Sequence, residues 1–163
     1  MAIIDDLQQS MLAESLGTPE LQELAMIADI QTFYKNDIIF SENEQEDSMY
    51  VLAEGRVAIE RRLLANHPLG HKHIQNVRRG QIFGEMGFIE KRSRSATAIA
   101  KSQIRVLRFG FEDLDELIDK DLRLGVKLLR TIAVLLSRRL RRMNDQWLRT
   151  LDDGSMLKEF EYF

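Results

Sequence analysis

The chain has 163 residues, of which 44% are apolar and 30% are charged, a balance typical of a globular protein with one sizeable core. The net charge of −3 gives no general affinity for nucleic acid or for an anionic membrane. Cysteine is absent, which excludes disulfides, thiolate metal sites and cysteine nucleophiles. The sequence has neither a basic leader with an apolar core nor a run of about 20 apolar residues, so we expect a cytoplasmic protein without a membrane span.

The first 30 residues have the periodicity of helices. Leucine and methionine recur at steps of three or four residues between positions 5 and 16. Gly17 interrupts that pattern, and Thr18 followed by Pro19 is typical of a new helix start. A second apolar stripe continues from there to Ala28. We therefore expect two helices within residues 5–30.

The middle of the chain, residues 32–110, has the pattern of short strands. The sequence Lys35-Asn36-Asp37 predicts a turn, and Gly55 predicts a hairpin between the runs on either side of it. Short strands at this spacing favour a small antiparallel roll or barrel. The expected strands are residues 33–34, 38–40, 49–52, 56–60, 73–77, 97–100 and 104–109.

Helical periodicity returns after Gly110. It predicts a short helix over residues 111–120 and a long helix over residues 122–151. We expect the first half of the long helix to pack on the roll and its second half to form a homodimer. The order of elements predicts one α+β domain, residues 1–151, and a short aromatic tail, residues 152–163. The expected coiled-coil seam is Leu129, Ile132, Leu136, Leu140, Met143, Trp147 and Leu151.

Residues 80–98 carry the chemistry that distinguishes this chain. Glu85 follows a flexible Gly84, and Arg94 comes nine residues later in front of small residues. A carboxylate accepts a hydrogen bond from a sugar hydroxyl, while a guanidinium pairs with two phosphate oxygens. Gly84 allows the backbone to approach a ligand, and a helical turn over residues 86–89 would add N–H donors. The segment therefore predicts a site that binds a sugar hydroxyl and a phosphate together.

These residues resemble a known cassette. Phe83-Gly84-Glu85-Met86 followed by Arg94-Ser95-Ala96 matches, in register, the phosphate-binding cassette of the cyclic nucleotide-binding domain family. The resemblance continues in residues 40–57 and in Ser137-Arg138-Arg139-Leu140, and so covers residues 20–150. It implies an antiparallel β-roll of the double-stranded β-helix or jelly-roll type, with N-terminal helices and a long C-terminal helix. It also implies a regulatory protein that signals to an effector protein.

The same resemblance assigns roles in binding. Glu85 would accept the ribose 2′-hydroxyl, and Arg94 would hold the cyclic phosphate. Ser95 beside the arginine and Asn144 at the base edge favour cyclic AMP over cyclic GMP, and binding would reposition the C-terminal helix. The other expected ligand contacts are Phe83, Gly84, Met86, Gly87 and Ala96 in the cassette, and Met143 on the long helix.

Four positions depart from the family pattern. Asn36 and Asn43 stand where many members have glycine, and asparagine is the next best residue for a positive φ, so we expect both turns to survive. Ser93 replaces a common proline, and Gly87 replaces a common alanine. These two changes loosen the loop and the short helix but remove no ligand contact.

Several alternatives remain. Glu85 and Arg94 would form a structural pair if the pocket no longer binds nucleotide, which would leave a protein-interaction module of the same fold. The three histidines at 67, 71 and 73 have the spacing of metal ligands, but a solvated loop is favoured. The sequence offers no catalytic constellation, so we expect no enzyme, and no metal is implied.

The long helix also carries four arginines. Transcriptional members of the family have a helix-turn-helix domain after this helix, and only a dozen residues follow Leu151 here. We therefore expect no DNA binding by that route. A solvated helix face is favoured over a nucleic-acid site for Arg138, Arg139, Arg141 and Arg142.

Overall fold

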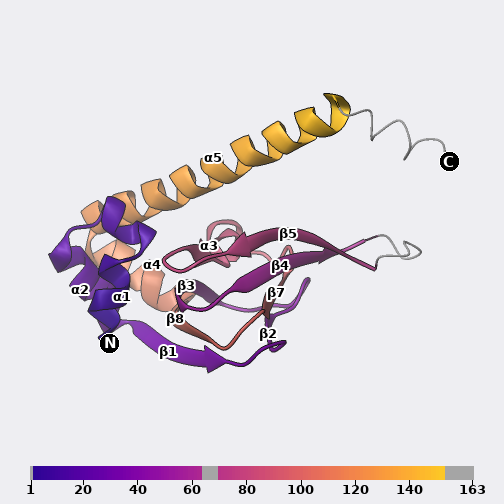
Figure 1. Ribbon diagram of the computed structural model, residues 1–163. Helices are drawn as coiled ribbons and strands as arrows, with labels where there is room; N and C mark the ends of the chain where they lie inside the picture. Colours follow the sequence, from indigo (N-terminus) through magenta and orange to yellow (C-terminus); the bar gives the residue numbers. More distant parts are fainter. Residues whose placement is uncertain (1, 64–69, 153–163) are drawn as a thin grey trace. The chain divides into compact units, whose positions relative to one another are not determined.

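The computed structural model describes residues 2–63 and 70–152 (Figure 1). Helices come first and last in the chain, and the strands lie between them, which confirms the α+β roll expected from the sequence. The elements in chain order are α1 Ile3–Gln8, η1 Met11–Glu14 (a 3-10 helix), α2 Thr18–Met26, β1 Ala28–Phe33, β2 Ile38–Phe40, β3 Ser48–Glu54, β4 Val57–Arg62, β5 His71–Val77, β6 Ile82–Phe83, α3 Glu85–Glu90, β7 Thr97–Ala100, β8 Ile104–Gly110, α4 Phe111–Lys120 and α5 Leu122–Asp152.

The strands form two antiparallel four-stranded sheets, in the orders β1-β8-β3-β6 and β2-β7-β4-β5. Side chains from both sheets meet in one apolar core. The rings of Phe40, Tyr50 and Phe83 stack there, with centroids 5.1–6.1 Å apart. The other core residues are Leu52, Val57, Val77, Ala98, Ala100, Ile104 and Val106.

The hairpin expected at Gly55 was wrong in one respect. The turn is present, but β3 pairs with β6 and β8 while β4 pairs with β5 and β7, so the strands enter different sheets. The turn at residues 35–37 likewise joins β1 in one sheet to β2 in the other. Two strands that follow each other in sequence separate here because each buries one face in the core between the two sheets.

The N-terminal helices are also shorter than the sequence pattern suggested. Ser10 ends the first helix, because its hydroxyl donates to the Leu7 carbonyl and accepts from the Leu12 N–H, and a 3-10 turn follows. The second helix ends at Met26 rather than near residue 30. Residues from Ala28 form strand β1, because β8 offers them a full antiparallel ladder. Pairing between distant strands overrides the local helical stripe.

The two asparagines at family glycine positions adopt the expected backbone. Asn36 has φ of 75° and Asn43 has φ of 67°. The Asn36 N–H donates to the Ala100 carbonyl at 2.8 Å, and the Asn43 N–H donates to the Arg94 carbonyl at the same distance. The prediction that both turns survive is confirmed, and both turns are tied to strand or loop backbone far away in sequence.

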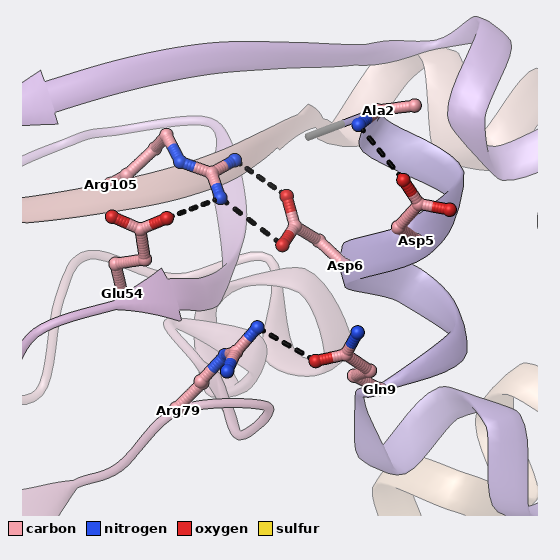
Figure 2. A network of polar contacts seen from close by, with 7 residues as sticks. All are labelled: Ala2, Asp5, Asp6, Gln9, Glu54, Arg79 and Arg105. Carbon is pink, nitrogen blue, oxygen red and sulfur yellow. Dashed lines mark hydrogen bonds and ion pairs between the residues drawn. The ribbon is translucent and has the colours of Figure 1, made fainter.

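A charged network fixes α1 to the roll (Figure 2). Asp6, which is 3% exposed, accepts two hydrogen bonds from Arg105 on β8, at 2.5 and 3.1 Å. Glu54 on β3 accepts a third at 2.8 Å. These hydrogen bonds, first to Asp6 and then to Glu54, raise the pKa of Arg105 and keep it charged. The exposed Gln9 accepts from Arg79 nearby.

The chain divides into two compact units, Met1–Leu128 and Leu129–Phe163. Buried leucines of α4 and of the start of α5, such as Leu114, Leu124 and Leu128, belong to the first unit. The described part of the second unit is the rest of α5. The single domain over residues 1–151 therefore stays a prediction, and most of the tail lies outside the described residues. Over the described ranges, every helix is too short or too polar to cross a bilayer.

We expect Gly55→Ala to destabilise the protein by more than about 2 kcal/mol. Gly55 has φ of 87°, and an added Cβ would lie 2.5 Å from the Gln103 carbonyl oxygen. Gly70→Ala is the matched control, because Gly70 also has a positive φ, of 62°, but open space around it. It should cost only the backbone strain, about 1 kcal/mol. Urea unfolding of both variants tests this, and equal losses would contradict it.

Replacement of Asp6 by alanine should cost about 2–3 kcal/mol, because Arg105 loses the buried partner of a two-bond ion pair. Gln9→Ala removes an exposed contact of the residue that follows the same helix and should cost within about 0.5 kcal/mol. Thermal unfolding of the two variants measures the difference. A loss in the Asp6 variant as small as in the Gln9 variant would show that the network does not hold α1.

Candidate functional site

The cassette begins where β6 ends. Phe83 pairs with Tyr50 of β3, and Gly84 then turns the chain into α3 with φ of 75°. Glu85 is the first residue of α3, which contains the helical turn expected over residues 86–89. Lys91 closes the helix in a left-handed conformation, with φ of 52°. A short strand and two left-handed residues thus fix the position of α3 on the roll.

Arg94 lies in the loop after α3 and is tied to another loop through its backbone. Its N–H donates to the Glu44 carbonyl at 2.9 Å, and its own carbonyl accepts from Asn43 at 2.8 Å. Two reciprocal backbone hydrogen bonds therefore hold the arginine beside the loop of residues 41–47. The Arg94 side chain points inward, and the residue as a whole is only 3% exposed.

The guanidinium of Arg94 is surrounded by acceptors and rings. Nη1 donates to the Gly84 carbonyl at 2.8 Å, and Nη2 donates to the Ser48 carbonyl and to the Glu46 carboxylate. The Phe40 ring lies against the guanidinium, 4.1 Å from Cζ to the centroid. Nε is buried and makes no hydrogen bond to any residue that the structure describes. The charge is thus well compensated, while Nε is left without an acceptor among the described residues.

Glu46 connects this guanidinium to the core. The Tyr50 hydroxyl donates to Glu46 Oε1 at 2.7 Å, while Glu46 Oε2 accepts from Arg94. Burial, and after it the hydrogen bond to Glu46, raises the pKa of Tyr50, so the hydroxyl keeps its proton. The Glu46 side chain is 22% exposed, against 2% for that of Arg94. The carboxylate therefore lies between solvent and the buried arginine.

The two glycines of α3 and its cap allow this close packing. A Cβ on Gly84 would lie 2.9 Å from Arg94 Nη1, and one on Gly87 would lie 3.1 Å from the same nitrogen. Gly87 thus lets the guanidinium lie directly under the first turn of α3. Glu85, at 1% exposed, is the other buried charged residue of the cassette.

The remaining cassette residues divide into exposed and buried ones. Met86 is 39% exposed, and its sulfur accepts a weak contact from the Ser95 hydroxyl at 3.6 Å. Ala96 is half-buried. Phe83 is 1% exposed, and its ring belongs to the core of the roll, so only its backbone remains for a ligand.

Met143 and Asn144 lie on α5 within the second unit, and both are exposed. Their contribution to binding a base stays a prediction. Of the three histidines, His71 and His73 are exposed on β5, and His67 lies outside the described residues. Across residues 2–63 and 70–152, no three acidic or histidine side chains are grouped to hold a metal ion.

The described residues line two surface cavities near this region. The first, of about 390 Å³, opens beside Thr97 and Ile99, which alternate along β7 with the core residues Ala98 and Ala100 and so face outward. The second, of about 540 Å³, lies beside the acidic residues of α4. Neither is lined by Glu85 or Arg94, both of which are covered by protein atoms.

Sequence reasoning missed the partners of Arg94. Glu46 lies in an acidic loop with Glu42, Glu44 and Asp47, and its spacing does not distinguish it from them. Phe40 and Tyr50 looked like ordinary strand residues. Only the backbone pairing of the loop with Arg94 gives Glu46 its position, and no local pattern carries that information.

The chain resembles several proteins over most of its length. A family model described as "Cyclic nucleotide-binding domain" matches residues 30–121. The chain is 28% identical, over 100 residues, to a cGMP-dependent protein kinase of Toxoplasma gondii, a match that covers 61% of this chain and 9% of that protein. It is 25% identical, over 104 residues, to a cAMP-dependent protein kinase regulatory subunit of Hypocrea atroviridis, covering 64% of this chain and 21% of that protein. The chain thus spans less than a quarter of these relatives.

Solved structures are also similar to this chain over most of its length. A cyclic nucleotide-binding domain from Methylobacillus flagellatus has a TM-score of 0.79 at 22% identity, covering 91% of this chain and 82% of that chain, which shows the shared fold. The catabolite activator protein of Thermus thermophilus has a TM-score of 0.72 at 26% identity, covering 88% and 63%. Since the family model spans more than half of the chain and includes β6, α3 and Arg94, this chain belongs to the cyclic nucleotide-binding domain family.

Proposed function

We propose that this chain is a regulatory protein that binds a cyclic nucleotide, with cyclic AMP preferred over cyclic GMP, and carries out no catalysis itself. The observation that carries the proposal is Arg94: a buried guanidinium in the family's cassette with a buried Nε that lacks a hydrogen bond among the described residues. Burying an arginine costs free energy, and a cyclic phosphate would supply the missing acceptor.

Glu85 supplies the second half of the grip. It is held at the first position of α3, directly after Gly84, whose carbonyl accepts from Arg94. Gly84 thus connects the two groups, because Glu85 follows it in the chain and the Arg94 guanidinium donates to its carbonyl. A ribose 2′-hydroxyl beside a cyclic phosphate requires this combination of acceptor and cation. Ser95 and Asn144 support the choice of adenine.

The output of binding would be a change in α5. A ligand shifts an equilibrium only through different affinities for two conformations. Contacts from the cassette and from Met143 and Asn144 would together provide that difference, and an effector protein would respond to it. The seam on α5 supports dimerisation, because Leu140, Met143 and Trp147 are 56–59% exposed.

A second candidate function is a protein-interaction module that binds no nucleotide. One observation favours it: Arg94 already has three acceptors, in Gly84, Ser48 and Glu46. In that case the arginine would be a structural element of the roll. Calorimetry with nucleotide separates the two functions.

Titration with cyclic AMP and cyclic GMP should give saturable heat, with tighter binding of cyclic AMP. Arg94→Ala should weaken binding by about 2–5 kcal/mol, and Arg94→Lys, which keeps the charge but loses the fork, by less. Arg92→Ala is the matched control, because it removes an exposed charge of the same loop and should leave affinity unchanged. Thermal unfolding without ligand establishes which variants are folded.

Absence of heat with both nucleotides in the folded wild-type protein would reject nucleotide binding and favour the interaction module. Equal affinities in the wild-type protein and in both Arg94 variants would show that Arg94 is not the phosphate contact. Nucleotide at 100 times Kd should also stabilise the wild-type fold by about 2.7 kcal/mol, measured as a rise in Tm.

Sedimentation should show a dimer that weakens in Trp147→Glu, because a charge on the seam opposes burial of the two helices against each other. Gln146→Glu is the control, since it adds the same charge at the neighbouring exposed position outside the seam. A monomer at every concentration of the wild-type protein, or equal dimerisation of both variants, would contradict the proposed interface.

A further inference from the structure

Glu46 occupies the donors that a phosphate would need. Its two oxygens accept from Arg94 Nη2 and from the Tyr50 hydroxyl, so the carboxylate is held at both ends. A carboxylate and a phosphodiester each carry one negative charge and two oxygens able to accept from a guanidinium. The other acceptors of Arg94 are backbone carbonyls of β3 and of the cap of α3, which cannot leave without displacement of those elements.

The Glu46 side chain can leave Arg94 without displacing its loop. The loop is fixed to Arg94 through the backbone of Asn43 and Glu44, and the Glu44 carboxylate accepts from Ser41 within the loop at 2.7 Å. None of these bonds involves the Glu46 side chain. At 22% exposure this side chain also reaches solvent, whereas the Arg94 side chain, at 2%, is covered by protein atoms.

We infer that Glu46 is an internal anion that competes with the phosphate of the nucleotide for Arg94 and so sets the affinity of the site. This inference rests on the proposed function. Without ligand, Glu46 compensates the charge of the buried arginine and keeps the cassette folded. On binding, the cyclic phosphate replaces Glu46 at Nη2 and reaches Nε, and the carboxylate rotates into solvent. The free energy needed to release Glu46 is subtracted from the binding free energy.

If Glu46 competes with the phosphate, removal of its charge should strengthen nucleotide binding, whereas loss of a purely structural contact should not. Glu46→Gln keeps the size of the side chain but removes its charge and replaces one acceptor oxygen with an NH2 donor, so the phosphate displaces it more easily. Cyclic AMP should then bind roughly tenfold more tightly than to the wild-type protein. If Glu46 only supported the cassette, the same change would weaken binding or leave it as it was.

Two further variants sharpen the test. Tyr50→Phe removes the hydroxyl that holds Glu46 Oε1 and leaves the ring stacked on Phe40 and Phe83, so binding should tighten by a smaller factor, roughly threefold. Glu44→Gln is the matched control, because it removes one negative charge from the same loop at a side chain whose described partner is the Ser41 N–H and not the Arg94 guanidinium. Its affinity should equal that of the wild-type protein.

The test is a calorimetric titration of the wild-type protein and the three variants with cyclic AMP, with thermal unfolding as the check of folding. Tighter binding in Glu46→Gln and wild-type affinity in Glu44→Gln support the inference, as does binding that appears only in Glu46→Gln. Equal or weaker binding in Glu46→Gln overturns the inference while nucleotide binding by the wild-type protein stands. Equal tightening in Glu44→Gln also overturns it, because net charge alone would then explain the effect. Absence of binding in all four folded proteins rejects the proposed function, and the inference with it.

Discussion

Burial of the Arg94 guanidinium is the interaction on which the cassette depends. A cation in a dry environment is tolerated only where acceptors surround it. Carbonyls from β3 and from the cap of α3, the Glu46 carboxylate and the face of Phe40 supply that environment. Each comes from a different part of the chain. The arginine therefore ties the loop of residues 41–47, β3 and α3 together, and a shift of any of the three would change its contacts.

The roll makes this convergence possible. Because β3 and β6 are neighbours in one sheet, the start of α3 lies beside the start of β3, where Ser48 and Glu46 are found. Because β2 lies in the other sheet, Phe40 approaches the same point from across the core. The network of Asp6, Arg105 and Glu54 joins α1 to the same sheet by a second buried ion pair. The ion pairs Arg94–Glu46 and Arg105–Asp6 thus connect the loop of residues 41–47 and α1 to the roll and its apolar core.

A buried arginine with a movable partner has consequences for function. If the partner of a buried cation cannot move, the cation has no donor to offer a phosphate. If the cation has no partner, the buried charge destabilises the fold whenever phosphate is absent. A carboxylate that is held by two hydrogen bonds and is still one-fifth exposed satisfies both needs. A change in the free energy needed to release this carboxylate would change the affinity for the nucleotide without any change in the cassette itself.

The local features of this protein follow directly from its amino-acid sequence. Periodicity identified the helices and most of the strands, asparagine was sufficient for the left-handed turns at 36 and 43, and the spacing of Glu85 and Arg94 identified the cassette, because backbone preferences and side-chain chemistry act within a few residues. Tertiary structure alone decided that β3 and β4 enter different sheets, that Ala28 begins a strand and that Glu46, among four acidic residues of one loop, meets Arg94. These outcomes depend on which distant segments share the core, and no local preference encodes that choice.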